Sequence, residues 1–257
     1  MTFGHSATTL NAYIIKELKY MKVAFFDIDG TFFRDSLLVE HFKLLFKENL
    51  VSLDCWESKI RPKFLEWESR KGDYDDYLTE TGINYLNSLK WLDKSKIVQL
   101  AQKLIEIKGE KVYKYTREKL EFHKKNGYKI IIISGSPDFL VKEFAKKYKI
   151  EDFIATVYKT DKFNKFNGQI EPMWDSNSKR KAIDFFTKKY NINLKEAFAY
   201  GDTAGDFDLL KSVGNPIAVN PAAKLIDLIK NDIELSNKIK IVVERKDVIY
   251  SFNIQNI

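Results

Sequence analysis

Cysteine and histidine are scarce in this sequence of 257 residues, and long apolar runs are absent. The single cysteine, Cys55, excludes an internal disulfide framework and is typical of a reducing compartment. The three histidines, His5, His41 and His123, are far apart and lack the spacing of metal ligands, so we expect no zinc site. Because no apolar run approaches the roughly 20 residues of a membrane span, we expect neither a transmembrane segment nor a membrane partner.

Residues 1–20 also lack the pattern of a secretory signal. They read MTFGHSATTLNAYIIKELKY, without a basic start, an apolar middle and a small-residue cleavage site. We therefore expect a cytoplasmic protein in which residues 1–20 are an N-terminal extension. The first expected strand begins directly after Met21, which is compatible with a translation start at either Met1 or Met21.

A basic cluster is missing as well. The net charge of +7 arises from 43 lysines and arginines against 36 aspartates and glutamates, and the lysines are spread through the chain. Nucleic-acid-binding proteins concentrate their basic and aromatic residues, so we expect a solvated basic surface and no nucleic-acid partner. The hydrophobic content of 44% and the charged content of 31% are typical of a globular protein. The length suits one large domain or a core with an insertion, and the sequence leaves the oligomeric state open.

Short apolar runs alternate with helical patterns along most of the chain. Strands are expected at residues 21–26, 129–133, 196–200 and 216–219. Helices are expected at residues 112–126, 137–148, 178–190 and 206–212, with Ser136 as the N-cap of the second helix. A hairpin with its turn at Asn167 and Gly168 is expected within residues 156–174, and edge strands within residues 238–252. The alternation predicts an α/β fold with a Rossmann-like, doubly wound parallel sheet.

Residues 37–109 interrupt this alternation because they contain no strand-like run. Helical patterns occur at residues 38–48, 56–71, 74–89 and 94–107. We therefore predict an α/β core, formed by residues 21–36 and 110–257, with an inserted helical-bundle cap formed by residues 37–109.

Two aspartates end the first expected strand, within the stretch VAFFDIDGTFFRDS. Asp27 and Asp29 share a face, because residues two apart on an extended chain point the same way. Their charges repel each other, which indicates a function such as holding a divalent cation or dividing into a nucleophile and an acid/base. Gly30 permits a tight turn, and Thr31 offers a hydroxyl and an N–H group. The structural alternative is that these residues simply cap the strand.

Polar residues also follow two later strands. Ser134 precedes Gly135 and a helix start, which together form a ready anion site or, alternatively, only a helix cap. Asp202 and Asp206, in GDTAGD, can share or orient a metal ion, or cap a helix. Ligands bind at the carboxyl ends of the strands in such sheets, and all of these residues fall there.

Taken together, these motifs resemble those of the haloacid dehalogenase (HAD) superfamily of aspartate-nucleophile phosphohydrolases. The matching stretches are FDIDGT, ISGS, a lysine and YGDTAGD, in that order. The helical insertion and the stretch PIAVNPAAKL are similar to the phosphoserine phosphatase branch, called subfamily IB. The resemblance covers roughly residues 22–230 and implies a HAD core with a helical cap.

This resemblance implies roles for the aspartates. Asp27 would attack phosphorus to form an aspartyl-phosphate, while Asp29 would protonate the leaving alcohol and then activate water. Asp202 would bind Mg²⁺ together with the Asp27 carboxylate and the backbone carbonyl of Asp29. Asp206 would support this metal site without binding the ion.

The phosphate contacts are implied in the same way. Thr31, the Ser134 hydroxyl and the N–H group of Gly135 would bind the phosphoryl oxygens. Lys179 has the spacing before the fourth motif that phosphoserine phosphatases show, and Lys181 is the alternative. The lysine charge would offset the nucleophile and the phosphate, unless both lysines are surface residues.

The identities of a few motif residues narrow the expected function. Asp29 favours phosphatases and phosphomutases, because ion-pumping ATPases carry threonine there and dehalogenases lack this second aspartate. Ser36 stands where phosphoserine phosphatases place a glutamate, the cap segment GDYDDYLTET offers no arginine at the expected place, and Gly205 replaces the usual asparagine. We predict a Mg²⁺-dependent phosphatase acting on a small phosphorylated metabolite. The alternatives are phosphoserine hydrolysis, phosphoryl transfer to an acceptor other than water, and non-enzymatic binding of a phospho-ligand or nucleic acid.

Other residues near the expected site have two interpretations each. Arg34 either reaches a second anionic group of the substrate or forms a surface salt bridge. Trp67, Tyr74 and Tyr77 either line the substrate pocket or form the core of the helical bundle.

Overall fold

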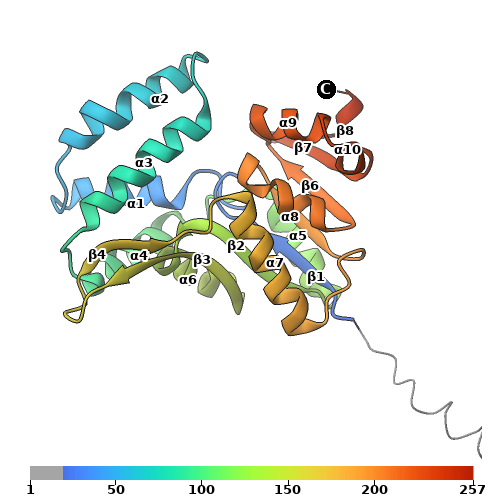
Figure 1. Ribbon diagram of the computed structural model, residues 1–257, viewed down its shortest axis with the longest axis horizontal. Helices are drawn as coiled ribbons and strands as arrows, with labels where there is room; N and C mark the ends of the chain where they lie inside the picture. Colours follow the sequence, from blue (N-terminus) through green and yellow to red (C-terminus); the bar gives the residue numbers. More distant parts are fainter. Residues whose placement is uncertain (1–19, 257) are drawn as a thin grey trace, which may run out of the picture.

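The sheet expected from the sequence is present in the computed structural model, which describes residues 20–256 (Figure 1). Within these residues it has eight strands in the order β4-β3-β2-β1-β5-β6-β7-β8. The strands are β1 (Val23–Phe26), β2 (Lys129–Pro137), β3 (Asp152–Thr160), β4 (Phe166–Glu171), β5 (Phe198–Gly201), β6 (Asn215–Val219), β7 (Lys240–Arg245) and β8 (Val248–Asn253). β4 and β8 pair antiparallel with their neighbours, and all other pairs are parallel. The predicted α/β class is confirmed; the predicted N-terminal extension, apart from Tyr20, lies outside the described residues.

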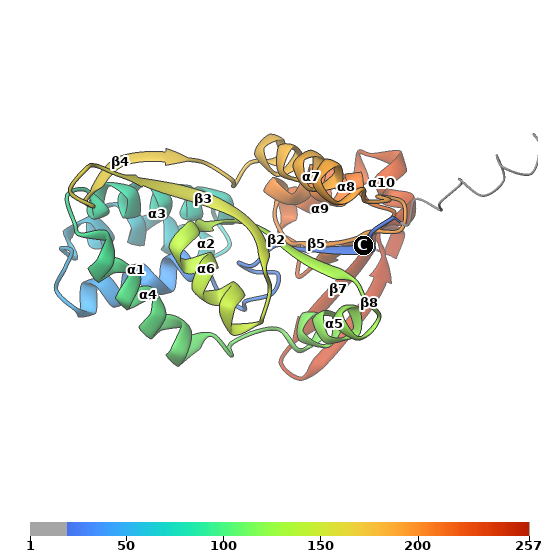
Figure 2. The ribbon, with the colours of Figure 1, turned by 90° about the horizontal axis from the view of Figure 1, so that it is seen from below.

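β1 is central in the sheet and is buried on both faces. Ala24 and Phe26 belong to one apolar cluster, and Val23 and Phe25 belong to the other. The helices are α5 (Lys114–Lys125) and α6 (Asp138–Lys147) on the first face, and α7 (Ser176–Tyr190), α8 (Phe207–Ser212), α9 (Ala223–Lys230) and α10 (Ile233–Lys238) on the second (Figure 2). The sheet is therefore doubly wound, as predicted, and burial on both faces explains the unbroken apolar run of β1.

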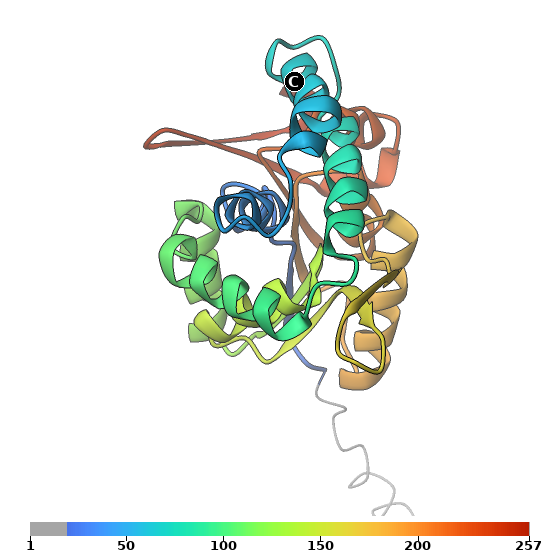
Figure 3. The same cartoon turned by 90° about the vertical axis from the view of Figure 1, so that its left-hand side faces the viewer.

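Residues 37–109 are helical, as predicted. They form α1 (Leu37–Lys47), a π-helical turn (Trp56–Ile60), α2 (Arg61–Glu68), α3 (Tyr74–Leu89) and α4 (Lys94–Lys108). Figures 1 and 3 show these helices gathered at one end of the molecule, beside the hairpin of β3 and β4. α4 packs against both α1 and α6, so one apolar cluster continues from these helices into one face of the sheet. The division of the chain into a core and a cap stays a prediction.

The hairpin within residues 156–174 is confirmed, but its turn is not at Asn167 and Gly168. The turn spans residues 161–165, where the Asp161 carboxylate accepts hydrogen bonds from two backbone N–H groups at 2.9 and 3.0 Å. Asn167 and Gly168 lie inside β4, where the strand pairing is irregular and the Asn167 side chain accepts from the N–H group two residues on, at 2.8 Å. The Asn-Gly pair, with Gly168 at φ +82°, therefore forms a bulge rather than the turn.

The predicted edge strands are confirmed as β7 and β8. In β7, the Glu244 carboxylate accepts hydrogen bonds from the backbone N–H groups of Lys114 and Tyr115 at 3.1 and 2.9 Å. A carboxylate at this place caps the N-terminus of α5, because it accepts from the first two residues of that helix. Within residues 20–256, no helix is both long and apolar enough to cross a membrane.

Candidate active site

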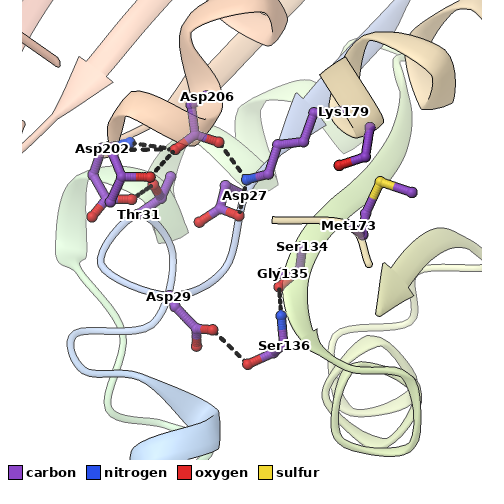
Figure 4. Close-up of polar contacts among 12 residues, drawn as sticks. Asp27, Asp29, Thr31, Ser134, Gly135, Ser136, Met173, Lys179, Asp202 and Asp206 are labelled. Atoms are coloured by element: carbon purple, nitrogen blue, oxygen red, sulfur yellow. Dashed lines mark hydrogen bonds and ion pairs between the residues drawn. The ribbon is translucent and has the colours of Figure 1, made fainter. Parts of the chain in front are cut away.

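The carboxyl ends of β1, β2 and β5 meet at one edge of the sheet and bring the predicted site residues together (Figure 4). Asp27 directly follows β1, and its N–H group donates to the carbonyl of Tyr200 in β5 at 3.0 Å. Asp202 directly follows β5, and Ser134 lies in β2 near its carboxyl end. Parallel pairing therefore gathers residues that are far apart in the sequence.

Lys179 links two of the aspartates. Its Nζ lies 2.7 Å from Asp27 Oδ1 and 2.5 Å from Asp206 Oδ1, and all three side chains are buried. Lys179 lies on the inner face of α7, a helix whose N-terminus is capped by the Asp175 carboxylate. Burial lowers the pKa of Lys179, but the two carboxylates raise it further, so the net shift is upward. Lys181 is exposed, so Lys179 is the member of this pair that reaches the site.

Asp202 packs against the loop that follows β1. Its Oδ1 accepts a hydrogen bond from the Thr31 hydroxyl at 2.7 Å. Gly30 has φ +77°, and a Cβ at this position would overlap the Asp202 carboxylate, so both the backbone conformation and the space require glycine. The Thr31 hydroxyl, predicted as a phosphate contact, is thus occupied by Asp202.

Asp206 is fully buried and uses both of its oxygens. One accepts from Lys179, and the other accepts from the N–H groups of Asp202 and Thr203 at 3.1 and 3.0 Å. The Asp206 side chain and Thr203 form a capping box for the short helical turn Ala204–Asp206. Asp206 therefore holds the lysine and the backbone beside Asp202, which fits a supporting position.

The acidic residues fit a divalent cation. Carboxylate oxygens of Asp27, Asp202 and Asp206 lie within 4.8 Å of one another. Burial, followed by the negative charges of Asp27 and Asp206, raises the pKa of Asp202 well above its ordinary value. Burial also raises the pKa of Asp27, despite the opposing charge of Lys179. One lysine does not offset this buried negative charge, and an all-oxygen donor set suits Mg²⁺.

Asp29 lies apart from this cluster and is held by neutral donors (Figure 4). Its Oδ1 accepts from the N–H group of Leu37 at 2.6 Å, and its Oδ2 accepts from the Ser136 hydroxyl at 2.5 Å. Burial raises the pKa of Asp29 to about 6, although both hydrogen bonds oppose the rise.

Ser136 belongs to the site because it contacts Asp29, whereas its sequence position predicted a helix N-cap. β2 continues to Pro137, and α6 begins at Asp138 without a side-chain cap, so the prediction that Ser136 caps this helix was wrong. The sequence signal for this contact is the second serine of SGS: residues two apart on a strand share a face, so Ser136 points to the same side as Ser134.

Ser134 and Gly135 border the cluster on β2. Ser134 is fully buried, and its Oγ accepts from the N–H group of Ser136 at 3.2 Å, which leaves the Ser134 hydroxyl proton available to a ligand. A Cβ on Gly135 would come within 3.0 Å of Trp174 Cβ, and a Cβ on Gly205 would overlap the Trp174 carbonyl oxygen. The segment around Trp174 thus leaves no room for a side chain at position 205.

A pocket of about 790 Å³ opens beside the cluster, with Gly30 and Asp202 among its lining residues. Ser36 also lines it, but its hydroxyl accepts from the N–H group of Val39 at 3.4 Å as the N-cap of α1. The Arg34 guanidinium lies 5.7 Å from the centre of the Tyr113 ring, and both residues line the pocket. Among residues 20–256 Arg34 forms no ion pair, so the predicted surface salt bridge is not made there.

The three aromatic residues line this pocket and also belong to the packed helical insertion, while their contact with a substrate stays a prediction. Trp67, Tyr74 and Tyr77 all line the pocket. Tyr77 is also buried in the apolar cluster, where Trp67 and Tyr74 pack against it.

The sheet is doubly wound, paired aspartates follow its central strand, and a lysine and further aspartates lie at the same edge. This arrangement is typical of a hydrolase site in an α/β fold. The model of the haloacid dehalogenase-like hydrolase family matches residues 24–211, and the chain belongs to this family. The family predicted from the motifs is confirmed.

Relatives in sequence and in structure agree with this assignment. The Streptomyces azureus protein named for inhibition of morphological differentiation is 25% identical over 200 residues, which are 77% of this chain and 71% of that protein. Phosphoserine phosphatase SerB1 of Mycobacterium tuberculosis is 26% identical over 136 residues, which are 52% of this chain but only 44% of that protein. A substrate-bound phosphoserine phosphatase is 20% identical, with a TM-score of 0.60 over 89% of this chain and 95% of that one, and it shares the fold.

Proposed function

We propose that this protein is a magnesium-dependent phosphatase that hydrolyses a small organic phosphate monoester through an aspartyl-phosphate on Asp27. The proposal rests on the different hydrogen-bond partners of the Asp27 and Asp29 carboxylates. Asp27 contacts the Lys179 ammonium at 2.7 Å, whereas the hydrogen bonds to Asp29 come from a backbone N–H group and a hydroxyl. Two carboxylates in different environments can perform different parts of one reaction.

In the first step, an Asp27 oxygen forms a bond to phosphorus while the bond from phosphorus to the alcohol oxygen breaks. Asp29 donates a proton to the departing alcohol, so that the alcohol leaves neutral. Lys179 offsets the charge of the nucleophile and the incoming phosphate, while Asp206 holds the lysine in place at 2.5 Å.

In the second step, Asp29 accepts a proton from water, and the water oxygen bonds to phosphorus. The bond from phosphorus to Asp27 breaks, which releases inorganic phosphate and restores both aspartates. The raised pKa of Asp29, about 6 as a result of burial, suits a group that must both donate and accept a proton.

Asp27 and Asp202, with the backbone carbonyl of Asp29, are the groups we assign to Mg²⁺. When bound, Mg²⁺ neutralises negative charge in the site and polarises the phosphoryl group. Ser134 and the Gly135 N–H group bind the phosphoryl oxygens in this proposal. Thr31 acts by orienting Asp202, because its hydroxyl already donates to that carboxylate.

Residues 37–109 form the cap in this proposal, over a core of residues 21–36 and 110–257. The cap excludes water during attack on phosphorus and admits it afterwards. The substrate is a small phosphorylated metabolite. Phosphoserine is the alternative, and it has less support because the Ser36 side chain is neutral and already caps α1. We further propose a cytoplasmic location, since one cysteine in 257 residues is typical of a reducing compartment.

The experiment measures phosphate release from p-nitrophenyl phosphate with and without Mg²⁺. We expect Mg²⁺-dependent release that falls by at least about a thousandfold in Asp27→Asn, which removes the nucleophile. Asp247→Asn, at an exposed position, is the matched control and keeps full activity. Full activity in Asp27→Asn would overturn the assignment, and added alcohols that yield new phosphoesters would redirect it to phosphoryl transfer.

A further inference from the structure

Four aromatic side chains form one side of the pocket beside Asp202, and we call them the aromatic wall: Phe64, Trp67, Tyr74 and Tyr77. Phe64 and Trp67 lie in α2, and Tyr74 and Tyr77 lie in the first turn of α3. Within each helix the two residues are three apart, which places them on the same face. Two helices therefore present their aromatic residues to one pocket.

The rings of the aromatic wall pack closely on one another. Trp67 and Tyr77 are stacked, with ring centres 5.8 Å apart and planes 6° apart, and Trp67 lies 5.0 Å from the ring of Tyr74. Phe64 lies 5.5 Å from the ring of Tyr77. Tyr77 is buried, while the other three rings are half-buried and line the pocket. The wall therefore offers apolar ring surface that a ligand can cover.

The aromatic wall lies in the same pocket as two residues of the candidate active site. Gly30 and Asp202 line the same pocket as Trp67 and Tyr74. Asp202, which we assign to the same metal site as Asp27, lines this pocket, so an ester whose phosphate is bound at that site would have its alcohol part beside the wall.

Several acidic groups in the pocket already have cationic partners. Glu40 pairs with Lys43 at 2.8 Å and also with Lys108. Asp75 of α3 pairs with Lys224 of α9 at 3.7 Å. Glu40 and Asp75 are therefore engaged by protein cations, whereas Glu68 and Asp73, which also line the pocket, form no ion pair among residues 20–256. The aromatic rings offer apolar surface beside these groups. The volume of about 790 Å³ lies within the range of sites that bind ligands well above the size of serine.

We infer that the alcohol part of the substrate carries an aromatic ring, which packs against the aromatic wall with Trp67 as its main contact. This inference rests on the proposed phosphatase function and names the substrate class for the same site. The wall acts in substrate selection, so its contribution appears in KM and in the choice between esters.

Three esters of primary alcohols test the inference: 2-phenylethyl phosphate, 2-cyclohexylethyl phosphate and ethyl phosphate. The bond that breaks is alike in all three, so differences in kcat/KM report contacts of the alcohol part. We expect the phenyl ester to exceed the ethyl ester by at least about tenfold, through burial of the ring. We expect it to exceed the cyclohexyl ester by about fivefold, because a planar ring stacks on aromatic side chains.

Trp67→Ala is the variant that tests the wall, and Trp91→Ala is its control, since Trp91 is 65% exposed and lies outside the pocket lining. We expect Trp67→Ala to raise KM for the phenyl ester by about tenfold, with little change for the ethyl ester. Trp67→Phe keeps an aromatic ring and should restore most of the preference. If Trp67→Ala only weakened the fold, turnover of all three esters would fall together, and this result would contradict a role in selection.

Equal kcat/KM for the phenyl and cyclohexyl esters would overturn the inference while leaving the phosphatase proposal intact. Absence of phosphate release from these esters and from p-nitrophenyl phosphate would overturn the phosphatase proposal instead. In that event, calorimetric Kd values of the same three esters with the unmodified protein and Mg²⁺ decide the matter. Tighter binding of the phenyl ester supports the inference, and equal or absent binding contradicts it.

Discussion

The Ser136 hydroxyl donates a hydrogen bond of 2.5 Å to the Asp29 carboxylate, joining the carboxyl ends of two neighbouring strands. The other oxygen of Asp29 accepts from the N–H group of Leu37, the first residue of α1. Asp29 is therefore oriented from both sides, by β2 and by the first helix of the insertion. A proton-transfer group works only when it is directed at the reacting oxygen, so these two donors matter for the proposed reaction.

Ser136→Ala tests the importance of this orientation. We expect kcat to fall by about tenfold, with KM nearly unchanged, because a hydrogen bond to a charged group is lost while the phosphate contacts remain. Ser136→Thr keeps the hydroxyl and should recover most of the rate, and Ser251→Ala, at an exposed position of β8, is the control. A rate for Ser136→Ala equal to that of the unmodified protein would show that Leu37 alone suffices to hold Asp29.

Mg²⁺ should stabilise the folded protein as well as support turnover. Asp27 and Asp202 are buried close together and their pKa values are raised by burial, so a bound cation removes an unfavourable charge arrangement. With Mg²⁺ at about one hundred times its Kd, we expect the free energy of unfolding to rise by about 2.7 kcal/mol. Urea titrations with Mg²⁺ and with EDTA measure this difference.

Asp202→Asn should abolish most of the stabilisation by Mg²⁺, whereas the exposed Asp247→Asn should retain it. An equal gain in both variants would place the ion outside the acidic cluster. The free energy of unfolding without Mg²⁺ is a second readout. We expect its value for Asp202→Asn to equal or exceed that of the unmodified protein, because the substitution removes a buried charge.

Much of this site could be predicted from the sequence because its residues follow strands that can be recognised as apolar runs. Asp27, Asp29 and Asp202 directly follow such runs, and the meeting of parallel strand ends needs no side-chain detail. The choice between Lys179 and Lys181 was harder, since both belong to one lysine-rich helix. Packing decides it, because Lys179 shares the buried face of α7 with Ala182.

The predictions for Ser136 and for the hairpin turn were wrong because each sequence stretch carries a stronger competing signal. A serine before a helix is an equally good cap, and its contact with Asp29 depends on the pairing of β1 with β2. Asn167 and Gly168 carry the strongest local turn signal, but Asp161 forms the turn with its own side chain. At Ser136 the pairing of β1 with β2 overrides the local preference for a helix cap. At the hairpin, the local hydrogen bonds of Asp161 override the turn preference of Asn167 and Gly168.

Gly205→Ala tests the close packing between the loop after β5 and the segment around Trp174. A Cβ at position 205 would overlap the Trp174 carbonyl oxygen, so one of the two segments must move. We expect a loss of about 1–3 kcal/mol in the free energy of unfolding, measured by urea titration.

Gly82→Ala is the matched control for that variant. Gly82 lies inside α3, and a Cβ there meets nothing within 4 Å. We expect this substitution to stabilise the protein by up to about 1 kcal/mol, because alanine favours a helix interior. Similar effects of the two substitutions would show that the space beside Trp174 is not restrictive.

His41 should make the stability of the protein sensitive to acid. It is fully buried in α1, its Nδ1 lies 2.7 Å from the Tyr85 hydroxyl, and burial lowers its pKa from 6.5 to about 4. Between these two pH values the unfolded chain binds a proton that the folded chain excludes, so stability falls as the pH falls from 6.5 towards 4. The contribution of His41 to this loss between pH 7 and pH 5 is about 2 kcal/mol.

His41→Gln removes the titrating group and keeps a partner for the Tyr85 hydroxyl. Urea titrations at pH 7 and pH 5 should show that this variant loses about 2 kcal/mol less than the unmodified protein. Tyr85→Phe is the control, because it breaks the same hydrogen bond without removing the histidine, and its cost should be similar at both pH values. A loss in His41→Gln as large as that of the unmodified protein would mean that His41 takes up its proton in the folded state, despite its burial against Tyr85 of α3 and Phe139 of α6.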